Sequence, residues 1–362
     1  MALSPLKPSI QRFYLIDILR LVSMFCIVAF HTYGAIYYSP FIAGEFRGSF
    51  FGWSMPFPRN LSFSGFTILG LSVFLFGLHW PKKPRLQFLM GLVTCGIILL
   101  LVGQGDHFFR ELVWEWDIYE FLVVSLLLLF FLSSRRKATY FLGAVGLVMT
   151  FIPIWQWSDQ WAMPTIARDI FFGTCDGSGR GGWALLPNLG FVTFHFALGR
   201  YLKSHSHKTK IFEISPLETV LWLVILALSF THLGAYGDTD IGPGFYCYIF
   251  RKPPLVFWSH YIWILFLLRL SVVKQVNDFL DSLSLARAVS SLQWSRSFGL
   301  CYFIHLGVIF VVSNWSEIFP KGSWQFDVFY LSIIPIVEIL MRLFRYFQSQ
   351  YILKTKGHLD KI

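Results

Sequence analysis

The sequence predicts an all-α membrane protein: a polytopic membrane helix bundle of about ten transmembrane helices, forming a single domain over residues 1–362. Composition is the first observation behind this prediction. Hydrophobic residues make up 55% of the chain and charged residues 14%, whereas soluble domains have roughly 45–50% and about 25%. The second is a mean hydropathy of +0.58. The third is that the apolar residues gather in runs close to the roughly 20 residues that cross a bilayer. A soluble enzyme, a disordered chain and a nucleic-acid-binding domain are excluded.

Ten apolar runs are long enough to be spans. They lie at about 14–38, 61–80, 86–104, 118–133, 138–156, 184–203, 215–235, 254–274, 297–314 and 326–347. No small-residue cleavage site precedes the first run, so we expect it to stay in the protein. The fourth is short unless Val113 to Trp116 extend it. The tenth contains Pro335. We expect the nearby Glu338 either to cap carbonyl groups freed by a kink there or to pair with Arg342 four residues later, and assign it no catalytic role.

Charge sets the orientation of the ten spans. An even number of spans puts both termini on one side, and the loops of that side hold 22 of the 30 Lys and Arg residues. Basic loops stay in the cytoplasm. We therefore expect cytoplasmic N and C termini and a plasma membrane location, in bacteria the inner membrane. The net charge of +10 mainly records this topology. Nine of the 14 Trp residues fall on or near the outer side, which fits a glycan acceptor or an interfacial aromatic belt equally well.

The first span carries three ionisable residues, which are costly in lipid and usually functional. Asp17 and Arg20 are three residues apart and can pair on one helix face. His31 follows Arg20 by eleven residues, about 20° past three full turns and roughly 16 Å along the axis. Both side chains therefore share a face, which suits a long ligand with a charged head at Arg20 and a reactive end at His31. The alternative is that Arg20 reaches to the headgroups and His31 is a hydrogen-bonded core histidine.

Two segments carry a family resemblance. Residues 12–23 read RFYLIDILRLVS and residues 28–31 read VAFH. They resemble the opening of the acyltransferase-3 family, whose signature is a basic residue, ten arbitrary residues and a His in the first span. Residues 297–305, SFGLCYFIH, are similar to the late segment of that family. The resemblance covers essentially the whole chain. These proteins are membrane acyltransferases that modify glycans and other cell-surface or secreted molecules.

The resemblance implies an acyl-CoA donor, acetyl-CoA in the first instance, bound from the cytoplasm. It implies that His31 is catalytic and that Arg20 binds the donor. The chemistry is coherent, because transfer to a hydroxyl needs a base near pH 7, and a neutral imidazole can be that base. An acyl-histidine intermediate is the alternative.

Other residues receive roles around this pair. Asp17, the expected partner of Arg20, is counted among the catalytic residues. The outer acidic residues Glu115 and Asp117 are expected to lie near His31 and orient it, the role of the carboxylate in acyl-transfer triads. Arg200 is expected to help bind the phosphates of coenzyme A. Arg180, Arg251 and His305 are expected to bind the acceptor, the arginines through acidic groups or developing negative charge. For His195 and His260 a packing role is favoured. Headgroup contacts and ordinary loop positions are the alternatives for most of these residues.

Several features carry no chemistry. The Gly-rich residues 173–182 lack the Gly-Lys-Ser/Thr of a phosphate loop. No Cys/His spacing indicates zinc, and we expect no metal. Cys175 and Cys247 share the outer side, where a disulfide is permitted but not required.

The function that we expect is acyl transfer from acyl-CoA to a hydroxyl of a cell-envelope or exported glycan, or of a lipid-linked saccharide. The partners are the lipid bilayer, the donor and the acceptor, without nucleic acid. Three alternatives stay open: an N-acetyltransferase of amino sugars, a transporter or flippase of lipid-linked sugars, and a catalytically silent relative. Transporters commonly show repeats and broken helices, and neither is evident in this sequence.

Overall fold

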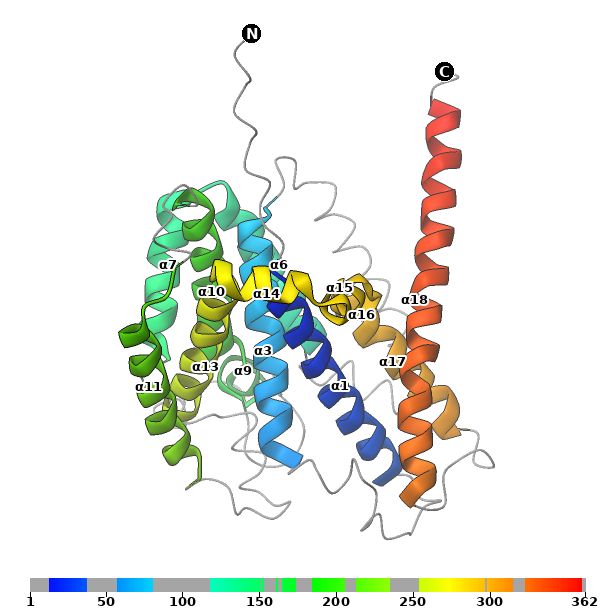
Figure 1. The fold of residues 1–362 in the computed structure, drawn as a ribbon, viewed down its shortest axis with the longest axis horizontal. Helices are drawn as coiled ribbons and strands as arrows, with labels where there is room; N and C mark the ends of the chain where they lie inside the picture. The colour runs from blue at the N-terminus through cyan, green and yellow to red at the C-terminus, as the bar shows by residue number, and fades with distance from the viewer. Residues whose placement is uncertain are drawn as a thin grey trace. The chain divides into compact units, whose positions relative to one another are not determined.

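The computed structural model describes residues 13–37, 57–80, 118–150, 152, 161, 165–173, 184–205, 213–234, 254–296, 298–314 and 323–359. These residues form helices joined by turns, with no strand among them. In chain order the helices are α1 (Tyr14–Tyr37), α3 (Phe57–Leu78), α6 (Ile118–Ser133), α7 (Arg136–Met149), α9 (Thr165–Phe172), α10 (Leu185–His205), α11 (Pro216–Gly234), α13 (Pro254–Val272), α14 (Lys274–Ser282), α15 (Ser284–Ser291), α16 (Gln293–Arg296), α17 (Phe298–Asn314) and α18 (Ser323–Leu359) (Figure 1). The all-α class is confirmed.

Helices occupy nine of the ten predicted positions, and the run at 86–104 lies outside the described residues. α6 coincides with its predicted run, whereas α7 ends at Met149, seven residues early, and α18 continues to Leu359, twelve residues beyond the prediction. Within the described ranges, no helix has both the length and the sustained apolar character needed to cross a membrane.

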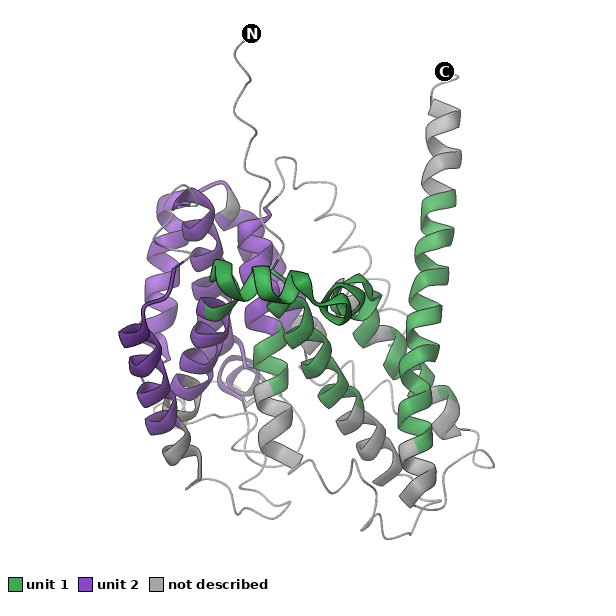
Figure 2. Cartoon of the chain, in the orientation of Figure 1, with its two compact units in different colours: residues 1–68, 270–362 green, residues 69–269 purple. Residues whose placement is uncertain are grey.

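The chain folds as two compact units (Figure 2). Unit 1 comprises Met1–Ile68 and Leu270–Ile362, and unit 2 comprises Leu69–Arg269. Unit 2 is thus inserted into the sequence of unit 1, and the boundaries fall within α3 and α13.

Small residues bring α7 and α10 of unit 2 into backbone contact. A Cβ atom added to Gly146 would lie 2.5 Å from the carbonyl oxygen of Gly190, and one added to Gly190 would lie 2.7 Å from that of Gly146. The two helices are antiparallel, since Tyr140 near the start of α7 meets Ser204 near the end of α10, with 3.5 Å between their hydroxyl oxygens. Only glycine permits an approach this close.

α10 is also in contact with α3. A Cβ atom on Gly77 would collide with the Phe196 backbone, and one on Gly70 would lie 3.1 Å from the Phe191 ring. Lys203 Nζ then donates to the carbonyl oxygen of Trp80 at 3.2 Å, just past the end of α3. Positions increase together along both helices, so α3 and α10 are parallel.

α11 and α13 form an antiparallel pair that is closed by polar contacts near both ends. Arg269 donates to both oxygens of Glu218, with Nε–Oε1 at 2.5 Å and Nη2–Oε2 at 3.0 Å. At the other end, the Ser259 hydroxyl donates to the carbonyl oxygen of Ser229 at 3.3 Å. The bidentate geometry makes the Arg269–Glu218 pair a specific link between the helices.

In unit 1, α1, α17 and α18 enclose an apolar core that α16 and α3 complete. Its buried members are Leu21, Met24, Ile27, Val28, Ile68, Trp294, Cys301, Ile309, Tyr330, Ile333, Val337 and Met341. α1 and α17 run in the same direction and α18 runs back, while α14 and α15 lie crosswise to all three (Figure 1). The Tyr330 hydroxyl fixes α18 to α1 by donating to the carbonyl oxygen of Phe25 at 2.8 Å.

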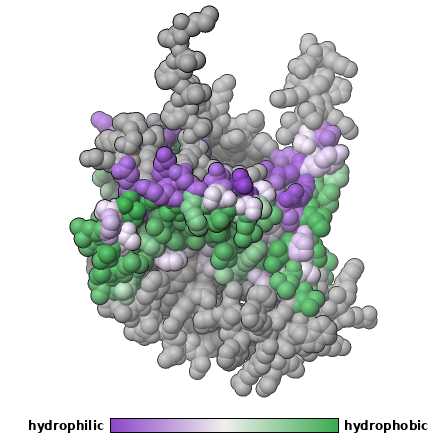
Figure 3. Space-filling view, in the orientation of Figure 1, coloured by the Kyte–Doolittle hydropathy of each residue, from purple (hydrophilic) through white to green (hydrophobic). Residues whose placement is uncertain are grey.

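Each unit turns apolar side chains outward. On α11 of unit 2 they are Leu217, Val220, Leu221, Leu223, Val224, Ile225 and Leu228. On α18 of unit 1 they are Val328, Leu331, Ile336, Ile339, Leu340, Leu343, Phe344, Tyr346 and Phe347. Apolar residues gather on the outer surface of both helices in Figure 3. Exposed apolar patches are typical of interaction sites for proteins or membranes.

Candidate functional site

α1 carries Asp17, Arg20 and His31 on one uninterrupted helix. The helix begins beside the Phe13 carbonyl oxygen, which accepts hydrogen bonds from the amides of Ile16 and Asp17. Asp17 lies in the first turn, where a negative charge favours the helix N-terminus. Because α1 is continuous from Tyr14 to Tyr37, positions 20 and 31 share one face within about 20°. This geometric premise of the sequence prediction is confirmed.

Arg20 is half-buried and lies near Asp17, with which it interacts electrostatically. The predicted proximity of these two residues is therefore confirmed. The Arg20 Nε atom is fully buried and has no hydrogen-bond acceptor in the part of the chain that the structure describes. A guanidinium N–H in this state is an available donor for an anionic group.

His305 lies in α17, which packs on α1 within unit 1. Its side chain is fully buried, its Nδ1 lies 3.1 Å from the carbonyl oxygen of Cys301, and its ring meets the ring of Tyr302 edge to face at 5.2 Å. A carbonyl oxygen only accepts, so Nδ1 carries the proton of the neutral ring. Cys301 itself belongs to the core that includes residues of α1. Four predicted site residues, Asp17, Arg20, His31 and His305, thus lie on two packed helices of one unit.

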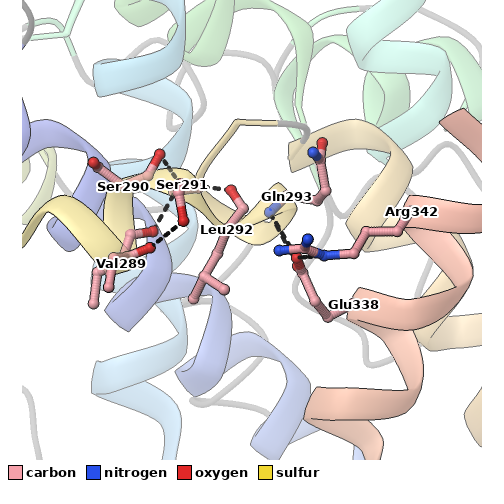
Figure 4. Close-up of polar contacts among 9 residues, drawn as sticks. Val289, Ser290, Ser291, Leu292, Gln293, Glu338 and Arg342 are labelled. Atoms are coloured by element: carbon pink, nitrogen blue, oxygen red, sulfur yellow. Dashed lines mark hydrogen bonds and ion pairs between the residues drawn. The ribbon is translucent and has the colours of Figure 1, made fainter. Parts of the chain in front are cut away.

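Short α16 is held against α18 by a polar link that the sequence did not predict. Glu338 of α18 accepts from the backbone amide of Gln293 at 3.0 Å and from Arg342 Nε at 2.6 Å (Figure 4). The expected pairing with Arg342 is confirmed. The neighbouring Trp294 packs its ring 5.2 Å from Phe25 of α1, and its buried Nε1 has no acceptor. Glu338 therefore fixes the position of α16. This helix contributes Trp294, whose Nε1 is a second buried N–H donor without an acceptor among the described residues, to the core beside α1.

Arg200 lies in unit 2, half-buried in α10. It interacts electrostatically with Tyr140 of α7, over whose ring Arg136 is also placed at 5.8 Å from the centroid. With Lys203 one turn later, these residues make a basic group at the start of α7 and the end of α10. Such a group is chemically suited to phosphates, as predicted for Arg200.

Several predicted positions lie outside the described residues. They are Glu115, Asp117, Arg180, Arg251 and the Cys175–Cys247 pair. Cys26 and Cys301, which are described, are free thiols. Among the described residues, no group of three or more His, Cys, Asp or Glu side chains is placed to hold a metal ion.

Sequence reasoning missed the polar atoms that the fold buries without partners, such as Trp294 Nε1 and His195 Nε2. Residue types alone could not find them, because their state depends on contacts between helices. Comparison with protein-family models, with characterised proteins and with solved structures finds no match to the chain.

Proposed function

We propose that the chain is an integral-membrane acyltransferase of the acyltransferase-3 type, with about ten spans and cytoplasmic termini in the plasma membrane. It transfers acetyl, or another acyl group, from cytoplasmic acyl-CoA to a hydroxyl of a glycan or lipid-linked saccharide at the outer face. His31 is the catalytic residue and Arg20 binds the donor. Arg200 and its basic neighbours contact the phosphates of coenzyme A.

The directions of the helices support the membrane topology. In the ten-span arrangement, spans two and six cross the same way, and α3 and α10 are parallel. Spans one and nine also cross the same way while span ten returns, and α1, α17 and α18 follow this pattern. Consecutive helices joined by a short loop are antiparallel in any bundle. The parallel pairs in question are far apart in sequence, and their directions are those expected of spans that alternate in direction across a membrane.

The packing of unit 2 supports a lipid environment. Glycines at the α7–α10 contact are the residues that membrane helices use where backbones touch. The outward apolar residues of α11 would face hydrocarbon.

The observation that carries the proposed function is the Arg20–His31 arrangement on α1. Positions 20 and 31 lie on one continuous helix, about 20° apart around its axis and roughly 16 Å apart along it, and among the described residues the buried Nε of Arg20 has no hydrogen-bond partner. An anionic group of coenzyme A at Arg20 would leave the thioester of the extended donor free to reach towards His31.

Transfer is either direct or through an acyl-histidine at His31, and the direct route needs one base. His31 takes the proton of the acceptor hydroxyl, and the oxygen bonds to the acyl carbon. The C–S bond of the thioester breaks, and the proton leaves with the thiol of coenzyme A. His305, fixed by its bond to Cys301, and the arginines Arg180 and Arg251 contact the acceptor. Asp17, Glu115 and Asp117 set the charge around Arg20 and His31.

The test supplies radiolabelled acetyl-CoA to membranes that contain the wild-type protein or its His31→Ala variant. We expect label in the surface glycan to fall at least about 100-fold in the variant, the scale of a lost general base. His79→Ala is the matched control, because His79 is exposed at the end of α3, and it should transfer normally. Equal labelling by wild type and His31→Ala would show that His31 is not catalytic.

The chemistry of the product separates the alternatives. An ester label is released by mild alkali, whereas the amide formed by an N-acetyltransferase survives it. A flippase would transfer no label at all, and would instead move a lipid-linked saccharide to the outer leaflet without dependence on acetyl-CoA.

A further inference from the structure

His195 of α10 is held in one tautomer at the centre of unit 2. Its side chain has no exposed surface, and its Nδ1 lies 2.8 Å from the carbonyl oxygen of Phe191, one turn earlier. Because a carbonyl oxygen only accepts, Nδ1 carries the proton. A buried imidazole is favoured in its neutral form, since charge is costly away from water. Nε2 therefore presents a lone pair, and among the described residues this fully buried atom has no hydrogen-bond partner.

The side chains that pack against the His195 ring include three aromatic rings. The His195 ring centroid lies 4.2 Å from that of Phe191, 5.2 Å from that of Phe194 and 5.5 Å from that of Tyr261. A buried acceptor without a donor destabilises the folded state. The apolar rings of Phe191 and Phe194 offer Nε2 no donor, so among these three described neighbours the donor is Tyr261, and otherwise a bound group can supply it.

Tyr261 of α13 contributes a hydrogen-bond donor near the acceptor Nε2 of His195. It is fully buried, and its hydroxyl lies near the Thr150 side chain without completing a hydrogen bond. Its ring centroid lies 5.5 Å from that of His195, with the two planes tilted by 30°. Neither the Tyr261 hydroxyl nor His195 Nε2 has a hydrogen-bond partner in the described parts of the chain, so the two atoms do not bond each other. Two adjacent rings thus bury an acceptor that lacks a donor and a donor that lacks an acceptor.

We propose that His195 and Tyr261 form an internal binding site for a single hydroxyl group. A hydroxyl donates to Nε2 and accepts from the Tyr261 hydroxyl at the same time. A carboxylate cannot donate to Nε2, and an ammonium group cannot accept from Tyr261. The hydroxyl belongs either to a trapped water molecule or to an alcohol or sugar that reaches into unit 2. The site does not depend on the acyl-transfer proposal, since it uses residues of α10 and α13 alone.

Histidine nitrogen NMR on the full-length protein in a membrane mimetic tests this site directly. The Nε2 signal of His195 is assigned by its loss in His195→Gln. We expect the wild-type signal to be that of a hydrogen-bonded nitrogen, and to shift towards the unbonded value in Tyr261→Phe. Tyr302→Phe is the matched control, because Tyr302 lies at a similar distance, 5.2 Å, from a different histidine. It should leave the His195 signal unchanged.

The source of the hydroxyl is separated by two further measurements on the wild type. Magnetisation transfer from solvent to the His195 signal indicates water. A saturable shift on addition of glycerol or glucose indicates an alcohol ligand. Either result supports the site. A wild-type Nε2 signal at the unbonded value, without solvent transfer or response to either probe, overturns it, whether or not the variants fold.

Stability gives a second readout. If the Tyr261 hydroxyl is bonded through the bound group, Tyr261→Phe lowers the equilibrium constant for folding by about five- to tenfold, the usual worth of one hydrogen bond. If the hydroxyl has no partner at all, its removal leaves that constant unchanged or raises it, which contradicts the site.

Discussion

Arg20 shows how a single residue links the sequence pattern to the chemistry. Its spacing to Asp17 and to His31 was visible in the sequence, and the continuous helix α1 gives both spacings their expected geometry. The unmatched state of the buried Nε atom was not visible. It arises from helices that are distant in sequence, and no local pattern encodes it.

Arg20→Gln is expected to raise the KM for acetyl-CoA by about ten- to hundredfold while kcat changes less. The reason is the loss of a hydrogen bond from a charged group, worth about 1.5–3 kcal/mol, in binding the donor rather than in the chemical step. Steady-state kinetics at varied acetyl-CoA measure it. Arg287→Gln, at an exposed position of α15 in the same unit, should change neither constant. A fall in kcat at unchanged KM would contradict the donor-binding role.

Glu338→Gln is expected to destabilise unit 1 by about 1–3 kcal/mol, because the carboxylate accepts from a backbone amide and from Arg342. Unfolding in mixed detergent micelles measures the change. Arg342→Gln is the control. Its side chain is 57% exposed, so its removal should cost at most about 1 kcal/mol. Equal losses in the two variants would mean that the ion pair, and not the Gln293 amide, carries the stabilisation.

The same carboxylate marks the limit of sequence reasoning about single residues. The pair with Arg342 follows from a spacing of four residues on a helix and was predicted. The amide of Gln293 is 45 residues away, and it becomes a partner only when α16 docks on α18. Local spacing predicts contacts within a helix, and contacts between helices require the fold.

At the scale of elements, hydropathy located the long helices and missed the short ones. α9, α14, α15 and α16 together with the last turns of α18 lie outside the predicted runs. These segments are amphipathic or polar, as in the sequence KQVNDFLDS of α14, so an average over apolarity does not detect them. The glycine contacts between α7 and α10 were also not predicted, because the sequence does not show which small residues of two helices face each other.

Gly146→Ala is expected to destabilise unit 2 by about 1–3 kcal/mol, the usual cost of overpacking. The new Cβ atom would lie 2.5 Å from the Gly190 carbonyl oxygen and 2.7 Å from its Cα atom, and backbone atoms can move aside only if the helices separate. Unfolding in detergent measures this loss. Gly307→Ala in α17 is the control, because beyond the adjacent backbone of its own helix no described atom lies within 4 Å of its Cβ position. The control should be neutral or stabilising by up to about 1 kcal/mol, and an equal loss in both variants would refute the contact.

At the scale of the whole molecule, the proposed topology puts residues 134–137 in the cytoplasm and the segment 157–183 outside. In a variant without the five native cysteines, Ser134→Cys should react with an impermeant maleimide only from the cytoplasmic side. Trp161→Cys should react only from the outer side. Both positions are exposed. Labelling of Ser134→Cys from outside would rule out the ten-span arrangement.

The insertion of unit 2 has a consequence for how the protein is made. The 201 residues from Leu69 to Arg269 separate α1 from α17 and α18, against which it packs. At a synthesis rate of about 5–20 residues per second, the ribosome needs roughly 10–40 seconds to cross this interval. During that time α1 has been synthesised, but α17 and α18, which complete its packing, have not. The helix that carries the proposed chemistry can therefore be packed into unit 1 only after all of unit 2 has been synthesised.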